Sequence, residues 1–363
     1  MRKKRWRNRK GAGLLALALT CVLALSGTGA LETRAAIAVD VNAECTLAID
    51  TQELYDLMED DYKNSETKPD GVKVTVDLFK VAVIDESGRY TPTGLFENDP
   101  DLAGKLAGIN SETDENFWKD LSSMLTQAIT DGNGVVKVKP DHTGTAGEGE
   151  YVKFEGLDTG MYLVVPRQVT TYFYMYNFTP YLVSLPNNYY DPDKTDSSDE
   201  WVYTVEMGLK PGREERYGSI KIMKELTEMS MMPGNEATFV FQVDIETLKG
   251  DKYQKMVSMT FDGTDPKEVV IEQIPAGSTV RVEEVYSGAG YEIADGSSYI
   301  WSGKELPAND KYGEGSVVDV KFVNQPDGTT TGGYGIENHF TVDGNGQPQY
   351  QGPNGPENEW SAE

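Results

Sequence analysis

The chain has 363 residues, of which 38% are hydrophobic and 25% are charged, and its formal net charge is −26. This length and composition fit about two globular domains. The strong negative charge argues against a protein that binds nucleic acid or an anionic membrane surface, because both are polyanions. We therefore expect a solvated extracellular surface and no nucleic-acid partner.

Residues 1–36 have the pattern of a secretory signal peptide. The basic stretch MRKKRWRNRK precedes the apolar stretch GAGLLALALTCVLALSG, and the small residues Ala35 and Ala36 offer a cleavage site. Cleavage would change the net charge to −33, because the segment carries eight basic residues and one acidic residue. The alternative is an uncleaved membrane anchor. Cys45 would be the only cysteine of a secreted chain, which would then have no intramolecular disulfide.

Residues 37–211 are predicted to form a first β-sandwich domain. Segments rich in Tyr, Val and Thr alternate with Gly, Asp and Asn, a pattern typical of antiparallel sandwiches. One helix is expected as an insertion, because Phe117, Leu121, Leu125 and Ile129 repeat every four residues and Gly132 follows. The expected strands cover residues 72–84, 134–140, 160–166, 179–186 and 201–207.

No metal site or cofactor is expected in this domain. The acidic stretch DPDKTDSSDE at 191–200 lacks the alternating ligands and the central Gly of a calcium loop, so it is interpreted as a solvated loop.

A domain boundary is predicted at 211–217, where Pro and Gly interrupt the strand pattern in LKPGREERYGS. A second β-sandwich domain is expected at 217–340. The segment 341–363, rich in Gly, Pro and Asn, is interpreted as a stalk or linker.

Three strands of the second domain carry a polar residue where an apolar stripe would continue inward. These residues are Lys224, Glu284 and Asn324. Side chains alternate between the two faces of a strand, so each polar side chain shares a face with the apolar residues before it. The apolar residues are Ile220 and Ile222, then Val280 and Val282, then Val318, Val320 and Phe322.

The three polar residues are chemically complementary. Burial favours the neutral forms of an amine and a carboxyl group. A neutral Lys224 amine can attack the side-chain carbonyl of Asn324, while Glu284 polarises that carbonyl and moves protons as ammonia leaves. The product would be an amide cross-link between the first and last strands. The alternative is a buried Lys–Glu ion pair with Asn324 at a strand end.

The segments GSIKIMK, VEEVYSGAGY and VKFVN resemble the collagen-adhesin B-type (Cna-B-like) domain of Gram-positive surface proteins and pilins. Glu284 and Tyr291 have the spacing of that family's E-box, although VYSGA replaces its usual Ala-Pro. The resemblance implies that Lys224 is the nucleophile, Asn324 the electrophile and Glu284 the catalyst of an isopeptide bond. Asn338 in YGIENHF is an alternative acceptor.

The first domain has a lysine in a similar place, but not its partners. Lys80 ends an apolar face, yet Pro166 occupies the position that the E-box glutamate would take, and the last strand contains no Asn. We expect the stem of Lys80 to pack and its ammonium to reach solvent.

The order of strands in the first domain resembles the N-terminal domain of sortase-assembled major pilins. Trp201, Val205, Met207 and Lys210 have the spacing of the pilin motif W-x-x-x-V-x-V-Y-P-K, with Gly-Leu in place of Tyr-Pro. The resemblance implies that a sortase joins the Lys210 amine to the C-terminal threonine of a neighbouring subunit. The alternative is an ordinary linker lysine. No LPxTG-like motif is found, so the subunit accepts a linkage without donating one, is simply secreted, or is truncated.

An enzyme acting on an external substrate is not expected. The two histidines, His142 and His339, are far apart, and CxxC, HExxH and GxSxG motifs are missing. The sequence predicts a structural protein of the cell surface, a pilin subunit with other pilin subunits as partners. The alternative is a secreted or surface adhesin that binds a host matrix protein or glycan through the aromatic segment 170–181, although we expect that segment to be mainly core.

Overall fold

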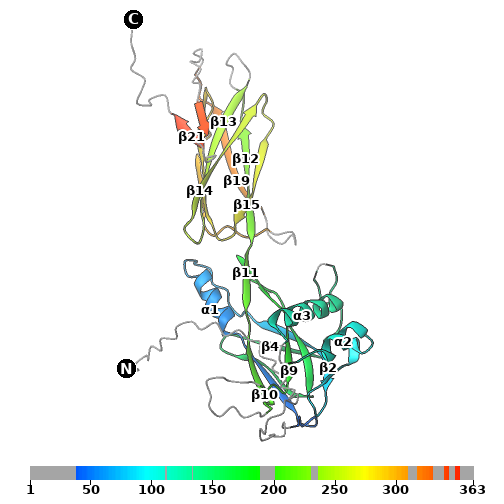
Figure 1. Cartoon of the computed structure of the whole chain (residues 1–363). Coiled ribbons are helices and arrows are strands. Elements are labelled where there is room, and N and C mark those ends of the chain that lie inside the picture. Colours follow the sequence, from blue (N-terminus) through cyan, green and yellow to red (C-terminus); the bar gives the residue numbers. More distant parts are fainter. Residues whose placement is uncertain are drawn as a thin grey trace, which may run out of the picture. The chain divides into compact units, whose positions relative to one another are not determined.

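Most of the secondary structure in the computed structural model of the chain is β-strand (Figure 1). The structure describes residues 38–110, 113–132, 134–188, 201–229, 236–309, 317–329, 339–342 and 348–351. The predicted signal segment, the acidic stretch at 191–200 and Asn338 lie outside these residues.

The chain divides into two units. Unit 1 contains the described residues up to Met58, with Gly71–Val169 and Tyr176–Gly212, and unit 2 contains Glu59–Asp70, Thr170–Met175 and the described residues from Arg213 onward. The prediction of β-rich sandwich units with a helical insertion in the first is confirmed.

Unit 1 is built on two main sheets. Their strand orders are β3-β2-β6-β9, with β4 also paired to β2, and β10-β1-β5. The strands of a further sheet, with the order β11-β8-β7, each have residues assigned to unit 1 and residues assigned to unit 2. The strands are β1 (Cys45–Asp50), β2 (Val74–Ile84), β3 (Tyr90–Pro92), β4 (His142–Ala146), β5 (Tyr151–Leu157), β6 (Gly160–Pro166), β7 (Val169–Thr170), β8 (Tyr174–Phe178), β9 (Tyr181–Leu185), β10 (Thr204–Gly208) and β11 (Pro211–Glu215).

The predicted helix is α3 (Glu115–Ile129). It begins where the Asp114 carboxylate accepts a hydrogen bond from the backbone N–H of Phe117, and it ends at Ile129, before the expected stop at Gly132. Its buried face includes Trp118 in addition to the predicted leucines and Ile129, whereas Phe117 is only half-buried.

Four elements between residues 38 and 140 differ from the sequence prediction. Helices α1 (Gln52–Asp61) and α2 (Pro100–Ala107) and the short 3-10 helix η1 (Gly94–Phe96) were not predicted. The sequence does indicate the start of α2, because Asp99 is a favourable N-cap residue and a proline follows it at the first helical position. The strand expected at 134–140 is wrong, since its described residues contribute only an isolated bridge between Val136 and Thr130.

Unit 2 contains a sandwich of two four-stranded sheets. Their orders are β15-β12-β19-β17 and β14-β13-β16-β18. The strands are β12 (Tyr217–Leu226), β13 (Ala237–Glu246), β14 (Lys252–Phe261), β15 (Lys267–Pro275), β16 (Thr279–Tyr286), β17 (Tyr291–Ile293), β18 (Ile300–Gly303) and β19 (Val318–Pro326). The first strand of the sandwich, β12, pairs in parallel with its last strand, β19.

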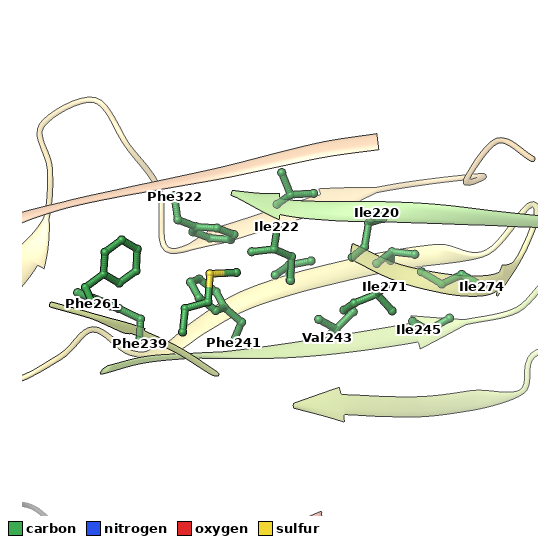
Figure 2. Packing of buried hydrophobic residues seen from close by; sticks show 14 of the residues in the cluster. Ile220, Ile222, Phe239, Phe241, Val243, Ile245, Phe261, Ile271, Ile274 and Phe322 are labelled. Atoms are coloured by element: carbon green, nitrogen blue, oxygen red, sulfur yellow. The ribbon is translucent and has the colours of Figure 1, made fainter. Parts of the chain in front are cut away.

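The core of unit 2 lies between these two sheets. Figure 2 shows Ile220 and Ile222 of β12 on one side and Phe241 and Val243 of β13 on the other. Burial alternates along β12, as expected for a strand with one face on the core.

The segment expected to be a linker also contains secondary structure. Strand β20 (His339–Val342) pairs with β21 (Pro348–Gln351) in an antiparallel hairpin, so part of the segment interpreted as a stalk or linker is formed by strands.

Candidate functional site

Lys224 lies on the inner face of β12. It follows Ile222 and precedes Leu226 at alternate positions, and its side chain is 0% exposed. The strand therefore carries an amine into the apolar core, as the alternation predicts. Burying an ammonium is costly unless partners replace its water.

Asn324 of β19 is the first partner. In the parallel pair, Lys224 is opposite Phe322 and Leu226 is opposite Asn324, so the lysine and the asparagine are diagonal neighbours on one face. The Lys224 amine donates a hydrogen bond to Asn324 Oδ1. Asn324 is also fully buried.

Glu284 of β16 is the second partner and comes from the opposite sheet. Its Oε2 lies 3.3 Å from Lys224 Nζ, and its Oε1 accepts a 2.6 Å hydrogen bond from Asn324 Nδ2. The side chain of Glu284 has no solvent exposure. Apart from the charge of Lys224, Oε2 has no hydrogen-bond partner among the described residues. The three predicted site residues thus meet in one buried cluster.

The site changes the acidity of its amine. Desolvation by burial lowers the pKa of Lys224 from 10.5 to about 8, although the charge of Glu284 acts in the opposite direction. Near neutral pH, the amine loses its proton far more readily than an exposed lysine does. A deprotonated amine is a nucleophile.

An aromatic ring completes the surroundings of the amine. Lys224 Nζ lies 4.4 Å from the ring centroid of Phe239, on β13. Our sequence interpretation did not single out Phe239. Its alternation with Phe241 and Val243 indicates the inner face, but its contact with Lys224 depends on how the two sheets stack.

Chemically, the cluster combines a nucleophile, a carbonyl electrophile and a proton carrier. The Asn324 amide has its oxygen against the amine and its nitrogen against the carboxyl group. Glu284 is within reach of both the proton donor and the leaving nitrogen. The cluster can therefore support amide exchange, with the Lys224 nitrogen replacing Asn324 Nδ2.

Lys210 lies elsewhere, in unit 1. It is exposed, two residues after the end of β10. With α3 and β9, it lines a cavity of about 510 Å³. Tyr181 also lines this cavity, and its buried hydroxyl has no hydrogen-bond partner among the described residues. The motif residue Trp201 packs against the unit 1 core, and Val205 is buried.

Lys80 has a different environment from Lys224. Its side chain is 20% exposed, its Nζ lies 3.0 Å from Asp158 Oδ2, and the Asp158 side chain is 85% exposed. The Lys80 amine also lies 5.9 Å from the ring centroid of Tyr162. This is a partly exposed ion pair.

Within the described ranges, no group of three or more His, Cys, Asp or Glu is placed to hold a metal ion. In the same part of the chain, no helix is long and apolar enough to cross a membrane.

Comparison with known proteins gives one family match, to a domain of unknown function (DUF5979), over residues 220–327. These residues contain Lys224, Glu284 and Asn324. A comparison with curated proteins finds no match.

Solved structures similar to the chain include Gram-positive pilins. The full-length major pilin SpaD of Corynebacterium diphtheriae is 12% identical, with 80% of this chain and 99% of that chain covered and a TM-score of 0.26. The major pilin SpaA of the same organism is 12% identical, with 77% and 100% covered and a TM-score of 0.24.

The Bacillus anthracis TIE protein is also similar, at 12% identity and a TM-score of 0.28. The match covers 78% of this chain and only 34% of the TIE protein. All three TM-scores are below 0.5, so these matches carry no argument about function.

Proposed function

We propose that the chain is a structural protein of a Gram-positive cell surface, a pilin-like subunit that closes an amide bond between Lys224 Nζ and Asn324 Cγ. One observation carries the proposal: an amine, a carboxamide and a carboxyl group from three strands touch one another inside an apolar core. A covalent link between β12 and β19 would join the first and last strands of the sandwich. It would serve a secreted chain that lacks a disulfide.

The proposed reaction needs no other reactant. Lys224 passes a proton to Glu284, and the neutral amine attacks Asn324 Cγ. The Nζ–Cγ bond forms and the Cγ–Nδ2 bond breaks. Glu284 returns a proton to Nδ2 through Oε1, which lies 2.6 Å from that nitrogen, and the nitrogen leaves as ammonia. Nζ, now bonded to Cγ, gives its second proton to Glu284, and that proton leaves with the ammonia as ammonium. Glu284 ends as the carboxylate it was at the start, so it acts as the catalyst of a single turnover.

The intact mass of the purified protein tests this reaction. Expressed in a host without a sortase, the protein should be lighter than its processed sequence by one ammonia. Glu284→Gln should restore the full mass, because the amide cannot carry the proton. A tryptic peptide pair joined through Lys224 and Asn324 should accompany the deficit.

A neighbouring glutamate provides the matched control. Glu283 of β16 lies beside Glu284 in sequence but pairs with Arg281. Glu283→Gln should therefore keep the mass deficit. The full sequence mass in the unmodified protein would overturn the proposed reaction.

We propose further that Lys210 receives an acyl group from another subunit through a sortase. No ion pair is seen for its exposed amine within the described part of the chain. The adjoining cavity lies against β9 and β10. Among the described strands, each of these two is the last in its sheet, so one of its edges has no strand neighbour there. An extended donor segment could lie there, with a carbonyl accepting a hydrogen bond from Tyr181.

Polymerisation in cells that carry the sortase tests the Lys210 proposal. Lys210→Arg should abolish the covalent ladder seen on denaturing gels, because a guanidinium is not a nucleophile at this pH. Lys119→Arg, in the wall of the same cavity, should keep it. A ladder that persists without Lys210 would contradict the proposal.

The adhesin alternative receives less support from the structure. Phe173, Tyr174 and Tyr176 of the aromatic segment are buried, and Tyr172 is exposed. Saturable binding of a host matrix protein or glycan, without a ladder, would favour an adhesin over a pilin subunit.

A further inference from the structure

We infer that Phe239 is a positioning residue for the cross-link, with its ring face acting as the third partner of the Lys224 amine. The inference rests on the proposed reaction and concerns a residue that does not itself react. It follows from the number of partners that surround Nζ.

A lysine ammonium has three N–H groups and no acceptor. Asn324 Oδ1 accepts one hydrogen bond, and Glu284 Oε2 lies 3.3 Å from Nζ. The ring face of Phe239 lies on a further side, at 4.4 Å from Nζ to the centroid, within the range of a cation–π contact. The three partners come from β19, β16 and β13, so they enclose the amine from both sheets.

The ring is itself held in place. Phe239 is fully buried, and it meets Phe261 and Tyr291 edge to face, at centroid distances of 5.6 and 5.5 Å. Gly288, at φ +78°, lies against the ring edge, where an added Cβ would be 3.4 Å from two ring atoms. These neighbours fix the ring plane, and the ring in turn limits where the amine can lie.

This arrangement has two chemical consequences. A ring face attracts the ammonium more than the neutral amine, so it offsets part of the desolvation that lowers the pKa of Lys224. It also keeps Nζ beside the Asn324 amide, which lowers the entropic cost of reaching the geometry for attack. An aliphatic side chain of similar size would fill the space without either effect.

Substitutions at positions 239, 241 and 324 leave the charged groups around the Lys224 amine unchanged. Glu284 is the facing carboxyl group of β16. Lys267 of β15 is opposite Lys224 in register, but its amine donates to the carbonyl of Thr260 and pairs with Asp262.

The first measurement is the pKa of Lys224 in an Asn324→Ala protein, where the amine cannot be consumed. Phe239→Leu in that background should lower the pKa of Lys224 by up to about one unit, as followed by NMR of ¹³Cε-labelled lysine. Phe241→Leu is the matched control, because Phe241 is fully buried on the same face of β13 and packs on Phe322. Phe241→Leu should leave the pKa of Lys224 unchanged.

The second measurement is the rate of cross-linking in the protein with Asn324 present, from intact mass at intervals after cell-free synthesis. Phe239→Leu should slow the loss of ammonia about tenfold, because the loss of positioning outweighs the larger fraction of neutral amine that a lower pKa gives. Phe241→Leu should not slow it. Incorporation of pentafluorophenylalanine at position 239 keeps the packing but removes the negative ring face, so it should lower the pKa of Lys224 even if Phe239→Leu folds poorly.

Equal pKa values and equal rates for the position 239 and 241 variants would overturn the inference. A failure of the proposed function looks different. In that case the unmodified protein keeps its full mass, while the pKa comparison in the Asn324→Ala background still shows whether Phe239 contacts the amine.

Discussion

Lys80 in unit 1 and Lys224 in unit 2 begin from the same sequence pattern and reach different chemistry. Each continues an apolar stripe, each has a carboxylate near its amine and each lies over an aromatic ring. Asp158 beside Lys80 is 85% exposed, however, whereas Glu284 beside Lys224 is fully buried. Among the described residues, a carboxamide lies within hydrogen-bond reach of Lys224, and none lies within reach of Lys80.

The comparison shows what makes a lysine reactive in such a fold. Water can solvate both members of the Lys80–Asp158 pair, so proximity to a carboxylate alone gives an ordinary ion pair. At Lys224, the removal of water lowers the pKa of the amine, and the amide supplies something to attack. Burial of the amine and the presence of the Asn324 carboxamide thus distinguish the reactive site at Lys224 from the partly exposed ion pair at Lys80.

The largest expected effect is loss of the cross-link in unit 2. Asn324→Ala should lower the free energy of unfolding by about 5 kcal/mol, because the link between residues 224 and 324 closes a loop of 100 residues and restricts the unfolded chain as a disulfide does. Urea unfolding measures it. Asp158→Ala, the matched change beside Lys80, should cost less than about 1 kcal/mol. Equal losses would contradict the distinction between the two lysines.

A pH dependence of intermediate size should appear once the cross-link is prevented. In Asn324→Ala, Lys224 of the unfolded chain keeps its proton up to the ordinary lysine pKa of 10.5, while the folded amine releases it near 8. The unfolded state binds more protons between these values, so stability should rise with pH across this window, by up to about 3 kcal/mol. The penalty for burying the ammonium is therefore fully present below pH 8.

A double variant isolates this effect. Asn324→Ala combined with Lys224→Met lacks the titrating amine, so urea unfolding across the same window should show no such rise. All other titrating groups are shared, and their contributions cancel in the difference. A rise of the same size in both proteins would assign it to groups other than Lys224.

The smallest expected effect belongs to Lys80. Lys80→Met keeps much of the packed stem and removes an ion pair with an exposed partner, so the free energy of unfolding should change by less than about 1 kcal/mol. The difference between the measured intact mass and the mass calculated from the sequence should be the same with and without the substitution. A loss comparable to that of Asn324→Ala would show that Lys80 has a partner of greater importance than Asp158.

Much of unit 2 could be predicted from sequence because its strands alternate clearly. Ile220, Ile222 and Lys224 face inward as the period of two requires. Unit 1 was harder, since α1 and α2 are short. At residues 134–140, β-branched residues suggested a strand, yet Val136 forms only an isolated bridge, because strand formation depends on a partner and not on composition alone.

The three complementary residues of unit 2, and the strand face that each occupies, can be predicted from sequence because side-chain alternation is a local property of the backbone. The parallel pairing of β12 with β19, the contact of Glu284 from the other sheet and the position of Phe239 over the amine are visible only in the folded chain. Strand register and sheet stacking come from the packing of residues distant in sequence, so no local pattern contains them.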